Sequence, residues 1–193
     1  DGWQSNDYTF VASAYQVVEL GKKSLVTIGT DVKRYGGDAT NSFISLDERI
    51  HITEADAYML AQRDVGDHLS LSGGWRIVNH SEFGLEHVPQ AGLSWYAFRG
   101  TTVKAAVSKG FRSPTVADLF LFPIANEQLR PENLWNYEIG YSQTLFNGKL
   151  ALELAGYVIE GSNLILTLPS TSGPPRKQNA GNVLHQGIEI TGK

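Results

Sequence analysis

Apolar and polar residues alternate along much of this chain with a period of two, which is the pattern of β-strands that bury one face. The alternation is clear over residues 24–35, 68–77 and 102–111, and it resumes near residue 135. Residues 7–20 also predict a strand, because they are rich in aromatic and β-branched side chains and contain no glycine or proline. Further strands are expected over residues 50–63, 90–98, 150–155 and 187–191. The pattern predicts an all-β antiparallel up-and-down meander of about nine strands.

Residues 50–63 form the ambiguous segment of this pattern. They include Glu54, Ala57 and Leu60, which would also suit a helix. We predict a strand, because the following Asp-Val-Gly-Asp sequence at residues 64–67 signals a tight turn and a clear strand comes next.

The connections between the expected strands alternate between short and long. Short turns lie near Gly21, Gly66, Gly100 and Asn147. Longer connections lie near Asp38, Ser81, Ala125 and Ser172. In an antiparallel meander, strict alternation places every short turn at one end of the strands and every long loop at the other. Outer-membrane barrels have this asymmetry, with short periplasmic turns and long extracellular loops.

The longest connection lies between the strands that end near residue 111 and begin near residue 135. Pro123 and Pro131 lie inside it, where they would disturb either a strand or a helix. Residues 114–122 fit one or two helical turns, because proline suits the first turn and Ser113 is a suitable cap.

The two faces of the expected strands differ as the wall of a membrane barrel requires. One face carries the large aromatic residues Trp75, Trp95, Trp135, Tyr137 and Tyr141. The opposite face carries the isolated charges Lys104, Glu138 and Glu153. Aromatic girdles on the lipid side and charges in a wet lumen explain both sets. A soluble antiparallel sandwich also alternates and is the alternative. Strand length favours the barrel, because several strands exceed the roughly 5–6 residues usual in soluble sheets.

Composition excludes several other classes of protein. The chain has 193 residues, of which 41% are hydrophobic and 19% are charged; its net charge is −4 and it has no cysteine. A negative net charge gives no electrostatic footprint for nucleic acid. Without cysteine there is no disulfide framework or thiolate metal site. No apolar run approaches the ~18 residues of a transmembrane helix. The first residues, Asp1-Gly2-Trp3, are not a signal peptide.

Several short motifs follow one another in the second half of the chain. They are residues 110–114 (Gly-Phe-Arg-Ser-Pro), 129–132 (Leu-Arg-Pro-Glu), 136–140 (Asn-Tyr-Glu-Ile-Gly), 179–181 (Asn-Ala-Gly) and 187–189 (Gly-Ile-Glu). In sequence and in order they resemble the late barrel strands of the TonB-dependent outer-membrane receptors. The resemblance covers roughly residues 108–193, and the first half fits the family by its strand plan alone.

The resemblance implies a large closed barrel in the outer membrane of a Gram-negative bacterium, with a separate N-terminal plug. Such receptors take up scarce nutrients with energy relayed by the TonB complex, which acts through the plug. This chain shows neither a plug nor a TonB box, and about nine strands fall well short of the family's 22. We therefore expect residues 1–193 to be part of a receptor barrel with the plug absent. On its own such a piece should aggregate, pair with a copy of itself or belong to a longer chain.

The family also suggests the cargo and the partners. A ferric siderophore or a similar metal chelate is the expected small-molecule cargo, by the family's usual substrates rather than by any residue here. Haem is disfavoured, because haem receptors often carry a histidine between these motifs and residues 115–125 contain none. The remaining expected contacts are outer-membrane lipid and the TonB complex.

The candidate ligand-binding residues are His80, Glu82, His87, Arg112 and Asn126. His80, Glu82, Glu86 and His87 cluster in one expected extracellular loop, where they could contact a metal-containing ligand or form an ordinary solvated loop. Arg112 could contact an anionic ligand or the plug, or hydrogen-bond to neighbouring loop carbonyls.

No catalytic residue, resident metal or cofactor is expected. Ser81 beside His80 is the one tempting pair for an enzyme, but adjacent loop residues rarely give nucleophile and base geometry. The main alternative function is a soluble β-sandwich that binds carbohydrate. Such a module would gather its aromatic residues in one concave patch, whereas a membrane barrel would spread them in two bands around one face.

Overall fold

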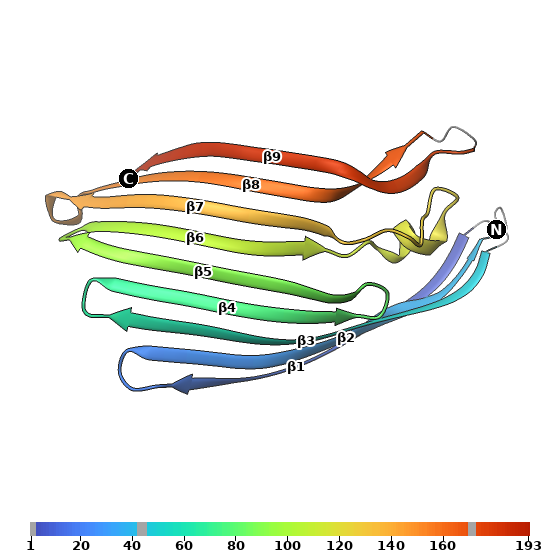
Figure 1. Ribbon diagram of the computed structural model, residues 1–193, viewed down its shortest axis with the longest axis horizontal. Helices are drawn as coiled ribbons and strands as arrows, with labels where there is room; N and C mark the ends of the chain where they lie inside the picture. The colour runs from blue at the N-terminus through green and yellow to red at the C-terminus, as the bar shows by residue number, and fades with distance from the viewer. Residues whose placement is uncertain (1–2, 42–45, 170–172) are drawn as a thin grey trace.

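The computed structural model describes residues 3–41, 46–169 and 173–193. These residues form one sheet of nine strands, in which every strand is antiparallel to its neighbour in the sequence and pairs with it (Figure 1). The predicted all-β meander is thus confirmed, including the strand over the ambiguous residues 50–63.

The strands are longer than the alternating pattern predicts. They are β1 (Trp3–Glu19), β2 (Ser24–Asn41), β3 (Leu46–Val65), β4 (Leu69–His80), β5 (Gly84–Phe98), β6 (Thr101–Arg112), β7 (Glu132–Leu145), β8 (Leu150–Leu168) and β9 (Arg176–Gly192). Two short helical segments complete the described elements, η1 (Ala117–Leu121) and η2 (Phe146–Gly148). A membrane-spanning strand needs about 9–11 residues. The longer strands would therefore extend beyond a membrane at the end opposite the short turns.

Two of the expected long connections are wrong. The polar stretch around Ser81 was expected to be a loop, but β4 and β5 continue through it and only residues 81–83 turn between them. The stretch near Asp38 also belongs to a strand, because β2 continues through Gly36 and Gly37 to Asn41. The strict alternation of short and long connections therefore fails. The connection between β6 and β7, which we call the crossing (residues 113–131), is long as expected.

The crossing contains one helical turn, within the one or two expected, but the turn begins later than expected. Its helical segment is the single turn η1, and Val116 rather than Ser113 occupies the cap position. The side chain of Val116 forms no capping hydrogen bond. Instead Thr115 and Asp118 bond to each other: the Thr115 amide donates to Asp118 Oδ2 over 2.9 Å, and the Asp118 amide donates to Thr115 Oγ1 over 3.1 Å. The proline at position 114 is buried. Because proline has no backbone N–H, it cannot donate a hydrogen bond before this turn.

Pro89 marks the place where one ladder of the sheet stops. It lies inside β5 and faces Trp75 of β4, where pairing continues without interruption. On the other side of β5, pairing with β6 begins only at Gln90, which faces Ser108. Proline has no amide hydrogen for a ladder, so one side of β5 is left unpaired beyond this point.

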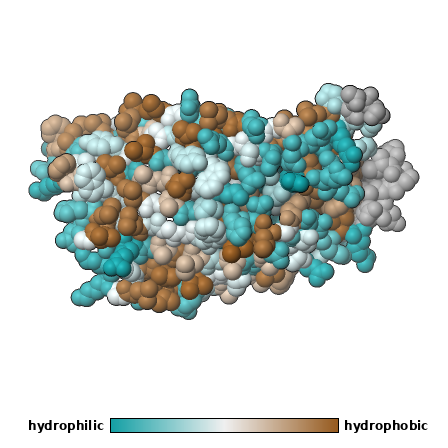
Figure 2. Space-filling view, viewed as in Figure 1, coloured by the Kyte–Doolittle hydropathy of each residue, from teal (hydrophilic) through white to brown (hydrophobic). Residues whose placement is uncertain are grey.

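The described residues bury few apolar side chains for a chain of this size. The buried set is Ala39, Ile50, Ile52, Val78, Leu119 and Leu129. The first four lie on β2–β4, and the two leucines lie in the crossing. Many large apolar side chains are exposed instead, including Phe10, Trp75, Ile139 and Ile190. Figure 2 shows brown apolar patches over the short-turn half and more polar surface toward the other end. No helix among the described residues is long and apolar enough to cross a membrane.

Candidate functional site

Strand register sorts the side chains into two faces. Val103, Tyr141, Leu154 and Ile190 are cross-strand partners in β6–β9 and define what we call the apolar face. The next row, Lys104, Gly140, Ala155 and Glu189, points to the opposite side and defines the polar face. The same register places Trp75, Trp95, Trp135 and Tyr137 on the apolar face and Glu138 and Glu153 on the polar face. The predicted division of aromatic and charged residues is confirmed.

The polar face is strongly charged on β2–β4. Asp31 and Asp56 are direct cross-strand neighbours, an arrangement in which like charges repel. Arg76 of β4 reaches both: it forms an ion pair with Asp31, and its Nε lies 3.2 Å from Asp56 Oδ1. Its guanidinium also lies 4.9 Å from the centre of the Tyr58 ring. One arginine shared between two carboxylates thus lets the polar face carry both.

His80 lies on the polar face at the end of β4 and is almost completely buried. The Glu82 amide donates to His80 Nδ1 over 3.1 Å, and the Phe83 ring stacks on the imidazole at 4.3 Å. His80 Nε2 lies 3.5 Å from Glu54 Oε1, and Glu54 also accepts a hydrogen bond of 2.9 Å from the Tyr35 hydroxyl. His80 therefore holds the β4–β5 turn in place.

His87 lies on the other side of the sheet. It faces Ile77 on the apolar face, and the Trp75 indole donates to its Nδ1 over 3.2 Å. The structure therefore does not bring the two predicted histidines together. Glu82 accepts a bond of 3.0 Å from Ser81, and Glu86 forms an ion pair of 3.2 Å with Lys109. Among the described residues, no three His, Cys, Asp or Glu side chains gather in a way that could hold a metal ion.

Arg112 ends β6 and joins the two strands that flank the crossing. It forms a two-pronged ion pair with Glu132, with both N–O distances at 2.7 Å, and its Nη1 lies 3.9 Å from Asp118 Oδ2. Glu132 Oε1 also accepts the Ile165 amide over 2.8 Å. Paired N–H donors that match a carboxylate fix both partners strongly. The partners of Arg112 are thus carboxylates, rather than the loop carbonyls considered from the sequence.

Asp118 is the buried centre of the crossing, and it is not among the candidate residues predicted from the sequence. Besides its bonds with Thr115, it forms an ion pair with Lys177 of β9, which lies far along the chain. The Lys177 amide in turn donates to the Ile124 carbonyl over 2.8 Å. A charge in a segment otherwise rich in leucine and phenylalanine, at residues 117–122, was the available signal. Its partner could not be read from the sequence.

Asn126 and Asn179 complete the attachment of the crossing to the β8–β9 hairpin. Asn126 Nδ2 donates to the Lys177 carbonyl over 2.8 Å. Asn179 accepts the Arg130 amide and donates to the Arg130 carbonyl, each over 2.8 Å, as a neighbouring strand would. We call the set Arg112, Asp118, Asn126, Glu132, Lys177 and Asn179 the clasp. Its contacts include residues of three of the motifs found in the sequence.

The clasp should be stable to mild acid. Burial alone would raise the pKa of Asp118, but hydrogen bonds from Lys177 and Thr115 outweigh it and hold the pKa below its ordinary value of 3.8. A carboxyl group with a lowered pKa in the folded state contributes stability that is complete above its ordinary pKa. That contribution is lost as the pH falls through the lowered value.

We therefore expect amide protection of residues 115–126 to persist from pH 7 to about pH 4 and to fall below it. Hydrogen exchange of the intact receptor, corrected for the intrinsic rate at each pH, measures this. Asp118→Asn removes one of the titrating carboxyl groups of the clasp and should weaken the transition. Loss of protection between pH 7 and about pH 5 would show that another group controls the clasp.

Comparison with known proteins decides the family. The family model for the TonB-dependent receptor-like β-barrel matches residues 1–193. The chain belongs to the TonB-dependent receptor β-barrel family. Barrels of this family are outer-membrane proteins of Gram-negative bacteria, so this chain lies in that membrane. The family is one of transport receptors rather than of enzymes. Membership in it favours the membrane barrel over the alternative of a soluble carbohydrate-binding sandwich.

Individual relatives are more distant. The chain is 29% identical over 123 residues to a vitamin B12 transporter, BtuB, of Photobacterium profundum, covering 62% of this chain and 20% of that protein. The siderophore receptor PirA of Pseudomonas aeruginosa has a similar structure, with a TM-score of 0.80 and 19% identity over 97% of this chain and 37% of that one. The RagAB peptide importer gives a TM-score of 0.72 and 14% identity over 98% and 28%. The chain thus spans well under half the length of these relatives, and the structural likenesses show the fold alone.

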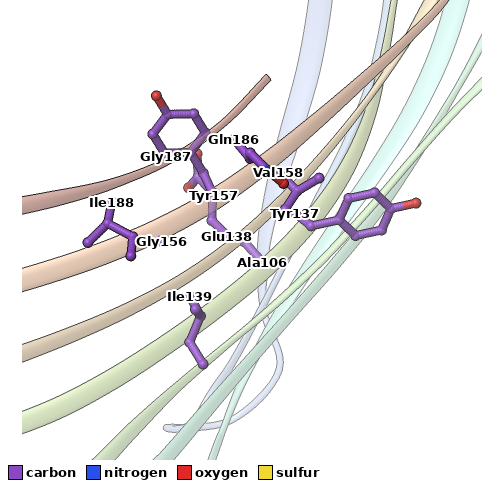
Figure 3. A pocket seen from close by; sticks show the side chains of 10 residues that line it. All are labelled: Ala106, Tyr137, Glu138, Ile139, Gly156, Tyr157, Val158, Gln186, Gly187 and Ile188. Carbon is purple, nitrogen blue, oxygen red and sulfur yellow. The ribbon is translucent and has the colours of Figure 1, made fainter. Parts of the chain in front are cut away.

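Family membership assigns an environment to each face of this open sheet. The apolar face contacts lipid, and the polar face lines the barrel interior. A hollow of about 430 Å³ lies at mid-sheet and is lined largely by side chains of the polar face, among them Gln62, Ser72, Gln90, Ser108 and Asn136. A second hollow, of about 770 Å³, is lined by β6–β9 (Figure 3). Most of its lining belongs to the apolar face, including Tyr137, Ile139 and Ile188, so it faces lipid rather than the interior.

Proposed function

We propose that the receptor containing this chain imports a scarce nutrient across the outer membrane with energy delivered by the TonB complex. The supporting observation is the family match over the whole chain, on a sheet with one lipid-compatible face and one charged face. Residues 1–193 would supply a section of the barrel wall, with its polar face toward a plug formed elsewhere in the protein. TonB would act through that plug and not through this chain.

The cargo we propose is a ferric siderophore or a similar metal chelate. Siderophore receptors are among the structural relatives, and the curated relative transports vitamin B12, which is also a bulky metal chelate. The peptide importer among the structural relatives shows that this fold does not by itself select the cargo. A chelate presents an already coordinated metal, so the wall needs no metal ligands of its own.

The residues of this chain that we propose for cargo contact lie at the end of the crossing. Arg112 ends β6 on the polar face, Asn126 lies in the crossing, and Glu82 is exposed in the β4–β5 turn. His80 and His87 were proposed with them, but His80 is buried and His87 faces the membrane side. Of the five, Arg112, with about half of its side chain exposed, is the one best suited to an anionic chelate.

An uptake assay tests the proposal. The complete receptor would be produced in a bacterial strain that lacks its own siderophore and vitamin B12 receptors, with and without a working TonB complex. We expect TonB-dependent accumulation of radioactive iron supplied as one or more ferric siderophores. Accumulation of labelled vitamin B12 but not of iron would show that the cargo is a different metal chelate and not a ferric siderophore. Uptake that does not depend on TonB would contradict the proposed function itself.

A further inference from the structure

A group of cationic and aromatic residues lies on the apolar face of β1–β3, toward the end of the sheet at which the crossing lies. Three adjacent cross-strand rows form it: Phe10–Arg34–Thr53, Tyr8–Gly36–His51 and Asn6–Asp38–Arg49. Every side chain in these rows is exposed. Below them the same face continues with the exposed apolar residues Val32 and Ile28. The group therefore follows directly on the surface that contacts lipid.

Aromatic side chains place this group at the level of the lipid headgroups. Aromatic residues of membrane barrels gather at the two membrane–water interfaces. On this face, Tyr8 and Phe10 lie beside the cations. Cations at this level meet the headgroups of the outer leaflet rather than its acyl chains.

The side chains in the group leave hydrogen-bond donors free toward the membrane. The Tyr8 hydroxyl lies 3.0 Å from His51 Nδ1, and a phenol that donates there leaves the proton of the neutral imidazole on Nε2. Arg34 has no ion-pair partner among the residues that the structure describes. Arg49 is already paired with Asp38, through Nε at 2.6 Å and Nη2 at 3.5 Å, although its side chain is largely exposed. Arg34 and His51 are diagonal neighbours on adjacent strands, close enough for both to reach one ligand.

We propose that Arg34 and His51 form a binding site for a phosphate group of lipid A in the outer leaflet, with Arg49 at its border. A guanidinium and an imidazole N–H are suitable donors to a phosphate. Phe10, beside Arg34, and Val32, below it, would contact the acyl chains of the same lipid. Because Asp38 already neutralises Arg49, Arg34 carries most of the charge. The site is independent of the cargo, since it faces the membrane and not the barrel interior.

The test uses the intact receptor purified in detergent and diphosphoryl lipid A as the probe. Native mass spectrometry measures how many receptors carry one lipid as the lipid concentration rises. We expect Arg34→Gln to weaken binding about fivefold, the effect of one surface cation on an anionic lipid, and His51→Gln to weaken it further. Lys33→Gln is the matched control, because Lys33 is the next residue on β2 and points to the polar face, over the Tyr35 ring.

The outcomes separate the alternatives. Weaker binding for Arg34→Gln than for Lys33→Gln, together with poor binding of lipid A lacking both phosphates, supports the site. Equal binding by the two variants overturns it, as does equal binding of the dephosphorylated lipid. If phosphatidylglycerol binds as tightly and is equally sensitive to Arg34→Gln, the site is not specific for lipid A and accepts any anionic phospholipid. Unchanged heat-dependent gel migration shows that each variant is folded.

Discussion

Replacing Asp118 with alanine is expected to free the crossing from the β8–β9 hairpin, at a cost of about 3 kcal/mol in local stability. The physical reason is that Lys177 and the Thr115 amide both lose their acceptor in a site where Asp118 is almost fully buried. A buried charge left without its partner is far more costly than a missing surface pair. In the intact receptor, amide exchange over residues 115–126 and 176–179 should quicken by about a hundredfold.

Glu127→Ala is the matched control for this change. Glu127 is an exposed carboxylate in the same crossing, and surface substitutions of this kind usually change stability by less than about 0.5 kcal/mol. Asp118→Asn keeps an acceptor for the Thr115 amide and should fall between the two. If Asp118→Ala exchanges no faster than Glu127→Ala, the crossing is held by its apolar contacts through Leu119 and Leu129 and not by the clasp.

Gly36→Ala should prevent β2 and β3 from pairing normally from the level of the lipid headgroups outward. Gly36 has φ of 147°, which residues with a side chain rarely adopt. A Cβ there would lie 1.9 Å from the Ile50 carbonyl oxygen on the neighbouring strand, so the backbone itself would have to move. Strain and clash together should cost about 3 kcal/mol or more. The fraction of intact receptor with the heat-dependent gel migration of a folded barrel should fall accordingly.

Gly110→Ala provides the comparison. Gly110 also lies in a strand, but its φ is not positive and a Cβ there would meet no atom within 4 Å. We expect normal assembly of this variant. Equal loss in both variants would mean that barrel assembly is sensitive to any added methyl group, and normal assembly of Gly36→Ala would mean that the β2–β3 extension is dispensable.

The strands and their faces could be predicted from the sequence because a membrane imposes alternation where it surrounds them. Trp75, Tyr137 and Lys104 fall on the faces expected of them for that reason. The ends of the strands could not be predicted. Beyond the membrane a strand no longer needs an apolar face, so the pattern fades around Asp38 and Ser81, although backbone pairing continues unchanged.

The contacts of the clasp could not be predicted from the sequence for a different reason. Motif residues such as Arg112 and Asn179 mark the region, but pairing depends on which distant segments the sheet brings together. Asp118 meets Lys177 only because the crossing, which links β6 to β7, also contacts the start of β9. A related argument explains why the histidines at positions 80 and 87 could not be placed. A loop would have allowed them to converge, whereas two paired strands send them to opposite faces.

The short β4–β5 turn also shapes the outer edge of this wall. On one side β2 and β3 continue well past the residues that pair with His80, and on the other the crossing rises beyond the end of β6 (Figure 1). The edge therefore has a notch at residues 81–83, between two taller flanks. A large molecule, such as an antibody fragment or a bulky thiol reagent aimed at a cysteine placed there, would find its lowest approach to the interior at this notch.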